Sequence, residues 1–211
     1  TKDYAGYRVG IFGLTTLRTL VIAGPDKSLT FTDEIETAKE MVDTLRNKEK
    51  CDIVILLGHL GDVEETPTHE TSLKIAEAVD GIDLIIDGHS HSYFAEPKVV
   101  NNTPIVTSEQ WGHYVGTGEL TIKDGKVINF EWHPEEITSE KYAPDADVAA
   151  LLQPFVDKAN ASLKDVVLKT TAEFEFGARL TRFQEMPSGD FLTDAMVWYL
   201  DPTGVKLDGA I

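Results

Sequence analysis

The sequence has little that would place it in a membrane, on a nucleic acid or in a disulfide-bonded fold. Its 211 residues include one cysteine, Cys51, so no internal disulfide can form and cysteine usage does not indicate the compartment. No run of about 18 apolar residues occurs, which argues against a transmembrane helix. Lysine and arginine number 19 against 36 aspartates and glutamates, a net charge of -17. This balance argues against binding to a nucleic-acid polymer or an anionic membrane, which requires clustered basic side chains.

What the chain does have is a globular composition, 42% hydrophobic and 26% charged, and an alternation of strand and helix patterns. Apolar runs favour buried strands, and apolar residues at helical spacing favour helices, the first of which Thr32 is expected to cap. In chain order the predicted elements are strand 7–14, helix 32–48, strand 51–57, helix 70–79 and strand 82–87. This order predicts an α/β fold, with a parallel sheet and helices packed on its faces.

An antiparallel hairpin is predicted after these elements. A short strand at 103–107 precedes two segments of alternating apolar and polar residues, 113–122 and 127–132. Asp124-Gly125 lies between the two segments, and Asp-Gly is a strong signal for a hairpin turn.

A boundary is predicted at 135–147, an acidic stretch with little apolar content. A helical pattern follows at 147–163, and Pro154 is expected to kink or interrupt it. Another helical pattern covers 190–200.

Three histidines stand where predicted strands end. His59 follows strand 51–57, and His89 and His91 follow strand 82–87. In α/β sheets, ligands bind beyond the carboxyl ends of the strands. Neutral imidazole is the commonest protein ligand for zinc and other transition metals. The residues therefore predict a metal centre, of which this chain holds a part.

The neighbouring polar residues receive more ordinary interpretations. Asp87 is expected to orient one imidazole by accepting its second N–H, and Asp62 is interpreted as a surface or supporting carboxylate. His69 precedes a predicted helix, which favours a solvent-exposed or capping role. His113 and His133 lie beside strands and are interpreted as structural, with substrate contact left open for His113.

Two of these motifs resemble a known family. Gly58-His59-Leu60-Gly61 and Gly88-His89-Ser90-His91 resemble the last two metal-binding motifs of calcineurin-like metallophosphoesterases, although Ser or Thr is usual where this chain has Gly58. Further segments are similar to the 5'-nucleotidase branch: the strand pair 103–107 and 112–116, the interdomain helix from Pro144, and Gly189 to Met196 at the start of the C-terminal substrate-binding domain, where the family more often has Gly-Asn than Gly-Asp.

The resemblance implies a four-layer sandwich of two sheets flanked by helices, of which the chain holds the second half. That half is assigned to residues 1–140. The resemblance also implies an interdomain helix at 141–163 and the start of an α+β C-terminal domain at 164–211. Two divalent metal ions, Zn, Mn, Fe or Co, are implied as cofactors, with His59 and His89 on one ion and His91 on the other.

The family's first half supplies an Asp-x-His pair, a bridging Asp and an Asn-His motif with the catalytic His. The chain begins about where these motifs should have ended, so the catalytic His is expected upstream of Thr1. We therefore expect a middle fragment that is inactive when isolated.

The implied activity is hydrolysis of nucleotide phosphate esters, with a small-molecule nucleotide bound by Arg182 and, less specifically, Arg179. Alternatives within the superfamily are a 2',3'-cyclic nucleotide phosphodiesterase with 3'-nucleotidase activity and a nucleotide-sugar or NAD pyrophosphatase. A non-catalytic surface binding protein that kept the fold is the alternative of another class. The resemblance also implies a periplasmic, cell-surface or extracellular location.

Overall fold

The computed structural model describes residues 1–166, 168–171, 173–174 and 184–204. The chain divides into two compact units, Thr1–Pro144 and Asp145–Ile211. None of the described helices is both long and apolar enough to cross a membrane.

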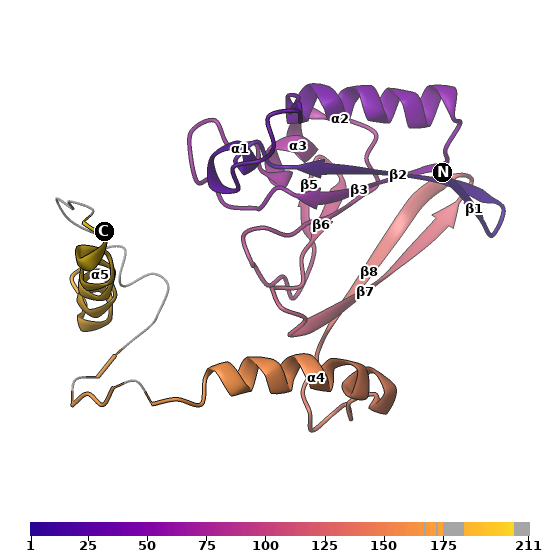
Figure 1. Cartoon of the computed structure of the whole chain (residues 1–211). Coiled ribbons are helices and arrows are strands. Elements are labelled where there is room, and N and C mark those ends of the chain that lie inside the picture. Colours follow the sequence, from indigo (N-terminus) through magenta and orange to yellow (C-terminus); the bar gives the residue numbers. More distant parts are fainter. Residues whose placement is uncertain (167, 172, 175–183, 205–211) are drawn as a thin grey trace. The chain divides into compact units, whose positions relative to one another are not determined.

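The first unit is built on a mixed six-stranded sheet (Figure 1). In spatial order the strands are β1 (Lys2–Tyr4), β2 (Tyr7–Thr15), β3 (Ile53–His59), β4 (Leu84–Ile86), β6 (Thr103–Val106) and β5 (Lys98–Val100). The four central strands are parallel, and the edge strands β1 and β5 pair antiparallel to their neighbours. The α/β fold and the parallel core are confirmed, whereas β1 and β5 were not predicted.

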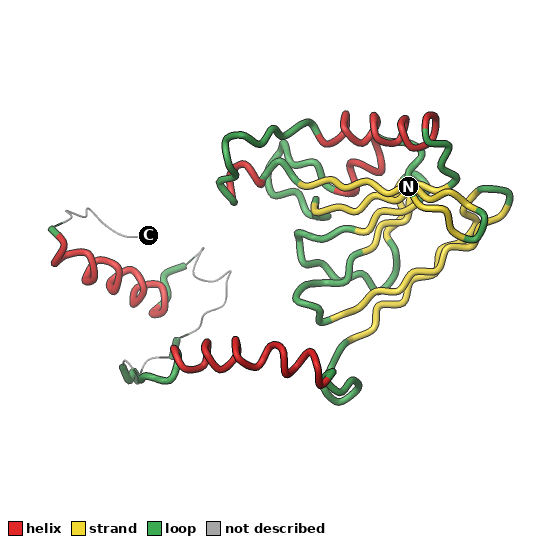
Figure 2. Tube along the Cα trace, turned by 45° about the vertical axis from the view of Figure 1, so that its right-hand side comes forward, coloured by secondary structure: helices red, strands yellow, loops and turns green. Residues whose placement is uncertain are grey.

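Helices lie along one face of this sheet, as Figures 1 and 2 both show. They are α2 (Glu34–Asp43), which continues as a π-helical turn over Thr44–Lys48, and α3 (Ser72–Ala78), while the short α1 (Thr19–Ile22) follows β2. The core beneath them is fully buried at Val54, Leu56, Ile75, Ile85 and Ile105.

The opposite face of the sheet carries exposed apolar side chains. Ile11, Leu57 and Ile86 are among the exposed large hydrophobic residues. Leu57 pairs in register with Ile86 and with Gly13, two residues beyond Ile11, so these side chains share a face. Within the first unit, Thr1–Pro144, the described helices α2 and α3 cover the other face.

The cap of α2 also differs from the prediction. The Asp33 carboxylate accepts the Glu36 N–H at 2.9 Å, whereas the Thr32 hydroxyl bonds to that of Thr37 at 2.8 Å. Asp33 has the extended backbone of a capping residue, so its side chain reaches the free N–H groups of the first turn.

The predicted hairpin is confirmed as β7 (Tyr114–Lys123) and β8 (Lys126–Glu136). Asp124 and Gly125 between them both have positive φ, as a type I′ turn requires. The Trp132 indole N–H donates to the Phe94 carbonyl at 2.9 Å. This bond ties the hairpin to the loop that follows β4.

The second unit contains α4 (Ala146–Ser162), α5 (Pro187–Leu200) and a 3-10 turn at Asp201–Thr203. Asp145 caps α4 by accepting the N–H groups of Asp147 and Val148, each at 3.0 Å. The helix is continuous through Pro154, so the expected interruption is wrong. A proline removes one backbone hydrogen bond, and the turns on either side hold the helix together.

Candidate metal centre

His59 and His89 meet at the carboxyl end of the sheet. His59 is the last residue of β3, where it pairs in register with Thr15 at the end of β2. His89 lies in the loop after β4 with a left-handed backbone, φ 78°. The His59 Nε2 and His89 Nδ1 atoms are 3.3 Å apart, with ring centroids separated by 5.0 Å. Two strands far apart in the sequence therefore present two imidazole nitrogens to one point.

The separation of these nitrogens fits a shared metal ion. Two nitrogens that bind one zinc at about 2.0–2.1 Å in tetrahedral geometry lie about 3.3–3.4 Å apart. Two unprotonated nitrogens repel each other at that distance. Either one ring donates an N–H hydrogen bond to the other, or a cation lies between the two nitrogens. The pair of histidines therefore fits two of the ligands of one metal ion.

His91 lies apart from this pair in its contacts. It is exposed, with a left-handed backbone of φ 55°, and its ring centroid is 6.3 Å from that of Trp111. The described residues contain no group of three or more His, Cys, Asp or Glu side chains placed to hold a metal ion. The structure thus brings two of the three predicted ligands together.

Asp62 connects the two histidine loops. Its carboxylate accepts hydrogen bonds from the hydroxyls of Ser90 and Ser92 and lies 2.8 Å from the Lys98 ammonium. Burial acts to raise its pKa, but the bonds from Lys98, Ser90 and Ser92 outweigh burial and lower the pKa to about 2. Asp62 is therefore ionised at neutral pH and holds the loop of residues 88–92 against the end of β3.

Asp87 fills a different role from the predicted one. Its carboxylate accepts the Leu60 N–H at 2.9 Å and fixes the backbone just after His59. A Cβ at Gly58 would lie 2.8 Å from Asp87 Oδ1. The glycine where the family usually has Ser or Thr therefore leaves room for the Asp87 carboxylate.

His69 is buried, with 2% of its surface exposed, so the prediction of an exposed or capping residue is wrong. Its Nε2 bonds to the Leu60 carbonyl at 2.7 Å, and its Nδ1 accepts the Glu65 N–H at 3.2 Å. Its ring packs edge-on against that of His89, with centroids 5.8 Å apart. The loop of residues 60–69 folds back over the site, which places His69 directly behind His89.

The surroundings of His89 favour its neutral form. Burial lowers its pKa, Glu65 acts in the opposite direction, and His59 and His69 lower it further, with a net decrease. Neutral imidazole is the form that binds a metal ion.

The other candidate residues lie elsewhere. His113 is exposed and its Nδ1 is 3.0 Å from a Glu109 oxygen. His133, on β8, is exposed and 3.9 Å from Glu131. Arg179 and Arg182 lie outside the described residues, so their contacts with substrate remain predictions.

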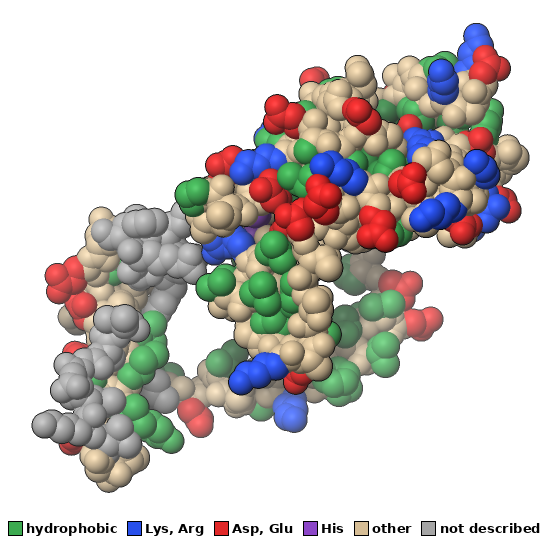
Figure 3. Space-filling view, turned by 90° about the horizontal axis from the view of Figure 1, so that it is seen from above, with side chains coloured by type: hydrophobic (Ala, Val, Ile, Leu, Met, Phe, Trp, Pro, Cys, Tyr) green, Lys and Arg blue, Asp and Glu red, His purple; other side chains and the backbone are tan. Residues whose placement is uncertain are grey.

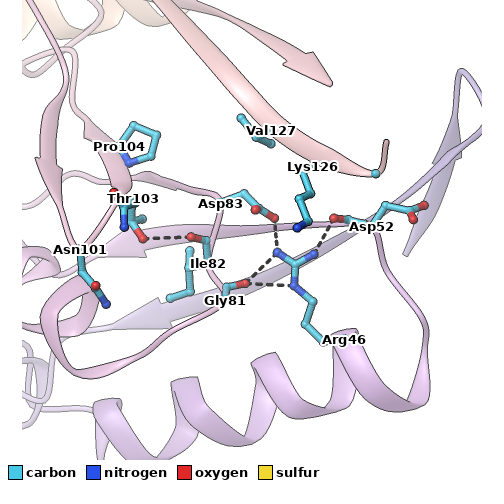
Figure 4. Close-up of a pocket in the computed structure, with 12 residues that line it drawn as sticks. Arg46, Asp52, Gly81, Ile82, Asp83, Asn101, Thr103, Pro104, Lys126 and Val127 are labelled. Atoms are coloured by element: carbon cyan, nitrogen blue, oxygen red, sulfur yellow. Dashed lines mark hydrogen bonds and ion pairs between the residues drawn. The ribbon is translucent and has the colours of Figure 1, made fainter. Parts of the chain in front are cut away.

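A cleft of about 510 Å³ lies at the opposite, amino edge of the strands (Figure 4). Arg46 lines this cleft. All five N–H donors of its guanidinium form hydrogen bonds within the protein. Their acceptors are the Gly81, Cys51 and Asp52 carbonyls and the Asp83 carboxylate. A guanidinium without a free donor holds the strands together and offers nothing to an anion.

Comparisons with known proteins agree with the sequence motifs. No protein-family model matches the chain. The chain is 28% identical over 200 residues, 92% of its length, to the trifunctional nucleotide phosphoesterase protein of Bacillus subtilis, and 31% identical over 147 residues, 69% of its length, to an uncharacterized metallophosphoesterase of the same organism. The crystal structure of a 5'-nucleotidase precursor from Thermus thermophilus covers 95% of the chain with 26% identity and a TM-score of 0.77.

The chain spans only part of each of these relatives: 13% and 30% of the two Bacillus proteins and 42% of the Thermus chain. Over that span the chain is similar to 5'-nucleotidases and to other members of the metallophosphoesterase superfamily.

Proposed function

We propose that the protein containing this chain hydrolyses phosphate esters of nucleotides, as a metal-dependent enzyme of the 5'-nucleotidase type. The observation that carries the proposal is the contact between His59 Nε2 and His89 Nδ1, 3.3 Å apart at the carboxyl end of the sheet. Similarity to a nucleotide phosphoesterase and to a 5'-nucleotidase supports the choice of substrate class.

The proposed cofactors are two divalent ions, Zn, Mn, Fe or Co. His59 and His89 would hold one ion and His91 the other, as the resemblance implies. When bound, such a pair neutralises phosphate charge and lowers the pKa of water. Asp62 keeps the two loops together, and Asp87 fixes the backbone beside His59. These residues hold the imidazoles in position before a metal ion arrives.

We further propose that the 211 residues alone do not hydrolyse nucleotides. The described part of the chain brings two imidazoles together but no group of three potential ligands. The chain also corresponds to less than half of the Thermus relative. A two-metal site needs more ligands than this pair provides.

The substrate and domain assignments are proposals as well. Arg182, and with less support Arg179, would bind the phosphate of a nucleotide with a planar set of donors. The domain division is 1–140 for the metallophosphoesterase part, 141–163 for the linker helix and 164–211 for the start of the substrate-binding domain. The proposed location is periplasmic, cell-surface or extracellular. Similarity to the Thermus protein, a 5'-nucleotidase precursor, supports this location.

The named alternatives differ in the bond that is cleaved. Cyclic nucleotide phosphodiesterase, 3'-nucleotidase and pyrophosphatase activities would use the same histidine pair, so they are separated by substrate assays. A non-catalytic binding protein of the same fold would bind nucleotide without turnover.

The test is His89→Ala in the protein that contains this chain. Loss of one nitrogen of the 3.3 Å pair should reduce AMP hydrolysis about a thousandfold, equivalent to roughly 4 kcal/mol, and lower the metal content measured by elemental analysis. The matched control is His133→Ala, an exposed histidine on β8, which should leave both unchanged. Equal turnover by the two variants would refute the assignment of the site.

A further inference from the structure

We propose that Glu65 is a positioning residue, which holds the proton of His89 on Nε2 and so leaves Nδ1 unprotonated toward His59. The inference rests on the proposed function for its importance, since a metal ion would bind at Nδ1. The evidence is the arrangement of residues around the Nε2 side of the His89 ring, which is the side away from His59.

The Nε2 atom of His89 requires a partner that the described hydrogen bonds do not supply. The atom is buried and makes no hydrogen bond within the described part of the chain. A buried N–H without an acceptor costs about 1–3 kcal/mol. The Glu65 Oε1 atom lies 3.5 Å away, and a shift of about half an ångström would complete a charge-assisted hydrogen bond.

A carboxylate at this place determines which ring nitrogen carries the proton. An ionised carboxylate only accepts hydrogen bonds, so the imidazole nitrogen that faces it must be the donor. With the proton on Nε2, the lone pair of Nδ1 points to His59 Nε2 at 3.3 Å. Carboxylates that orient metal-binding histidines in this way are common behind metal ligands.

Glu65 is itself held from two sides. Its other carboxylate oxygen, Oε2, lies 2.6 Å from Arg18 Nε, in the segment after β2. Its backbone N–H donates to His69 Nδ1 at 3.2 Å. The side chain therefore keeps its direction although 37% of it is exposed.

His69 fixes the backbone of Glu65 through a hydrogen bond. The Leu60 carbonyl can only accept, so His69 Nε2 carries the hydrogen of their 2.7 Å bond and Nδ1 is free to accept from Glu65. The buried His69 ring thus spans the loop from residue 60 to residue 65 while it packs against the ring of His89.

The other nearby carboxylates are engaged elsewhere. Asp87, the residue predicted to orient a histidine, accepts the Leu60 N–H. Asp62 bonds to Ser90, Ser92 and Lys98. Glu65 is the carboxylate that faces the Nε2 edge of His89.

The experiment compares Glu65→Ala with Glu64→Ala in the protein that contains this chain. Glu64 is the adjacent residue of the same loop, carries the same charge and pairs with Lys74 at 3.0 Å instead of with a histidine. The first measurement is long-range 1H–15N NMR of the imidazole nitrogens in metal-free protein, which identifies the protonated nitrogen of His89. The second is Zn²⁺ affinity, measured by competition with a chelator.

We expect Glu65→Ala to convert His89 from the Nε2–H form to a mixture of tautomers and to weaken Zn²⁺ binding about 10- to 100-fold. Glu64→Ala should change neither measurement. Glu65→Gln retains an amide oxygen that can accept the N–H, so it should restore the Nε2–H form.

The proposal is overturned if Glu65→Ala leaves the tautomer and the affinity unchanged, or if the two alanine variants behave alike. Neither measurement depends on turnover. A protein that failed to hydrolyse nucleotides but showed the tautomer change only in Glu65→Ala would refute the proposed function and support the role of Glu65.

Discussion

The central sheet uses its polar groups differently at the two ends of its strands, called here the amino edge and the carboxyl edge. At the amino edge, every donor of Arg46 is engaged by a carbonyl or by Asp83. At the carboxyl edge, His59 and His89 face each other at 3.3 Å, and His89 Nε2 lacks a hydrogen bond within the described part of the chain. A cleft of about 510 Å³ lies at the amino edge, yet the two imidazole nitrogens that face each other lie at the carboxyl edge.

This difference shows why cleft size alone is a poor guide to the site. A saturated polar network stabilises the fold and has nothing left for a ligand. Groups held close together with incomplete bonding can gain a partner when a ligand arrives. The chain has a net charge of -17. On the face shown in Figure 3, acidic and basic side chains are interspersed, and no continuous basic patch is visible among the described residues.

The strongest test of the amino edge is Arg46→Ala. Its removal leaves three backbone carbonyls and the Asp83 carboxylate without their partner, so we expect a loss of about 3 kcal/mol in the free energy of unfolding, measured by urea denaturation. Zn²⁺ affinity of the folded variant should not change, because the change is at the other edge.

The matched control for Arg46 is Lys39→Ala, on the same helix. Lys39 is exposed and pairs with Glu36 at 2.9 Å, an interaction worth at most about 0.5 kcal/mol. A comparable loss in both variants would mean that the Arg46 network does not stabilise the sheet, and a weakened metal site in Arg46→Ala would break the separation between the edges.

Asp62 provides a test of the carboxyl edge through pH. Its pKa is lowered to about 2 in the folded protein, from an ordinary value of 3.8. The carboxylate therefore contributes stability that is present above about pH 4 and is lost as the pH falls toward 2. The contribution is at most roughly 2 kcal/mol.

Asp62→Asn should remove this part of the pH dependence, measured as the free energy of unfolding between pH 2 and pH 5. Asp157→Asn is the control, since that carboxylate is exposed on α4 and bonds to Gln153 of the same helix. If Asp62→Asn kept the acid sensitivity of the original protein, the link between the two histidine loops would not depend on this charge.

Much of the fold was predictable because its signals are local. Asp124-Gly125 favours a type I′ turn on its own, and the apolar runs around Leu56 and Ile85 favour buried strands wherever they are placed. The contact between His59 and His89 followed from the general position of ligands at the carboxyl ends of strands.

The supporting residues were not predictable in the same way. The burial of His69 depends on the fold of the whole loop from residue 60 to residue 69, and no local pattern reports how that loop closes. Asp87 was assigned to a histidine, but a nearby backbone N–H, that of Leu60, takes its carboxylate. Which of several nearby carboxylates faces an imidazole is decided by tertiary packing, and this is why Glu65 was missed.

The smallest expected effect tests how closely the carboxyl edge is packed. Gly58→Ala would place a methyl group 2.8 Å from Asp87 Oδ1, so the carboxylate must move away from the Leu60 N–H. We expect a loss of about 1 kcal/mol in the free energy of unfolding and a roughly tenfold weaker Zn²⁺ affinity, because the backbone beside His59 loses its anchor.

Gly13→Ala is the matched control on the neighbouring strand β2. A Cβ at Gly13 would lie 3.8 Å from the Leu57 carbonyl, an ordinary contact, and alanine also restricts the unfolded chain. This variant should be as stable as the original protein or slightly more so, with unchanged Zn²⁺ affinity. Gly58→Ala could instead lose stability and keep its Zn²⁺ affinity. Asp87 would then stabilise only the fold, as Arg46 does at the amino edge. The difference between the two edges would then rest on His59 and His89.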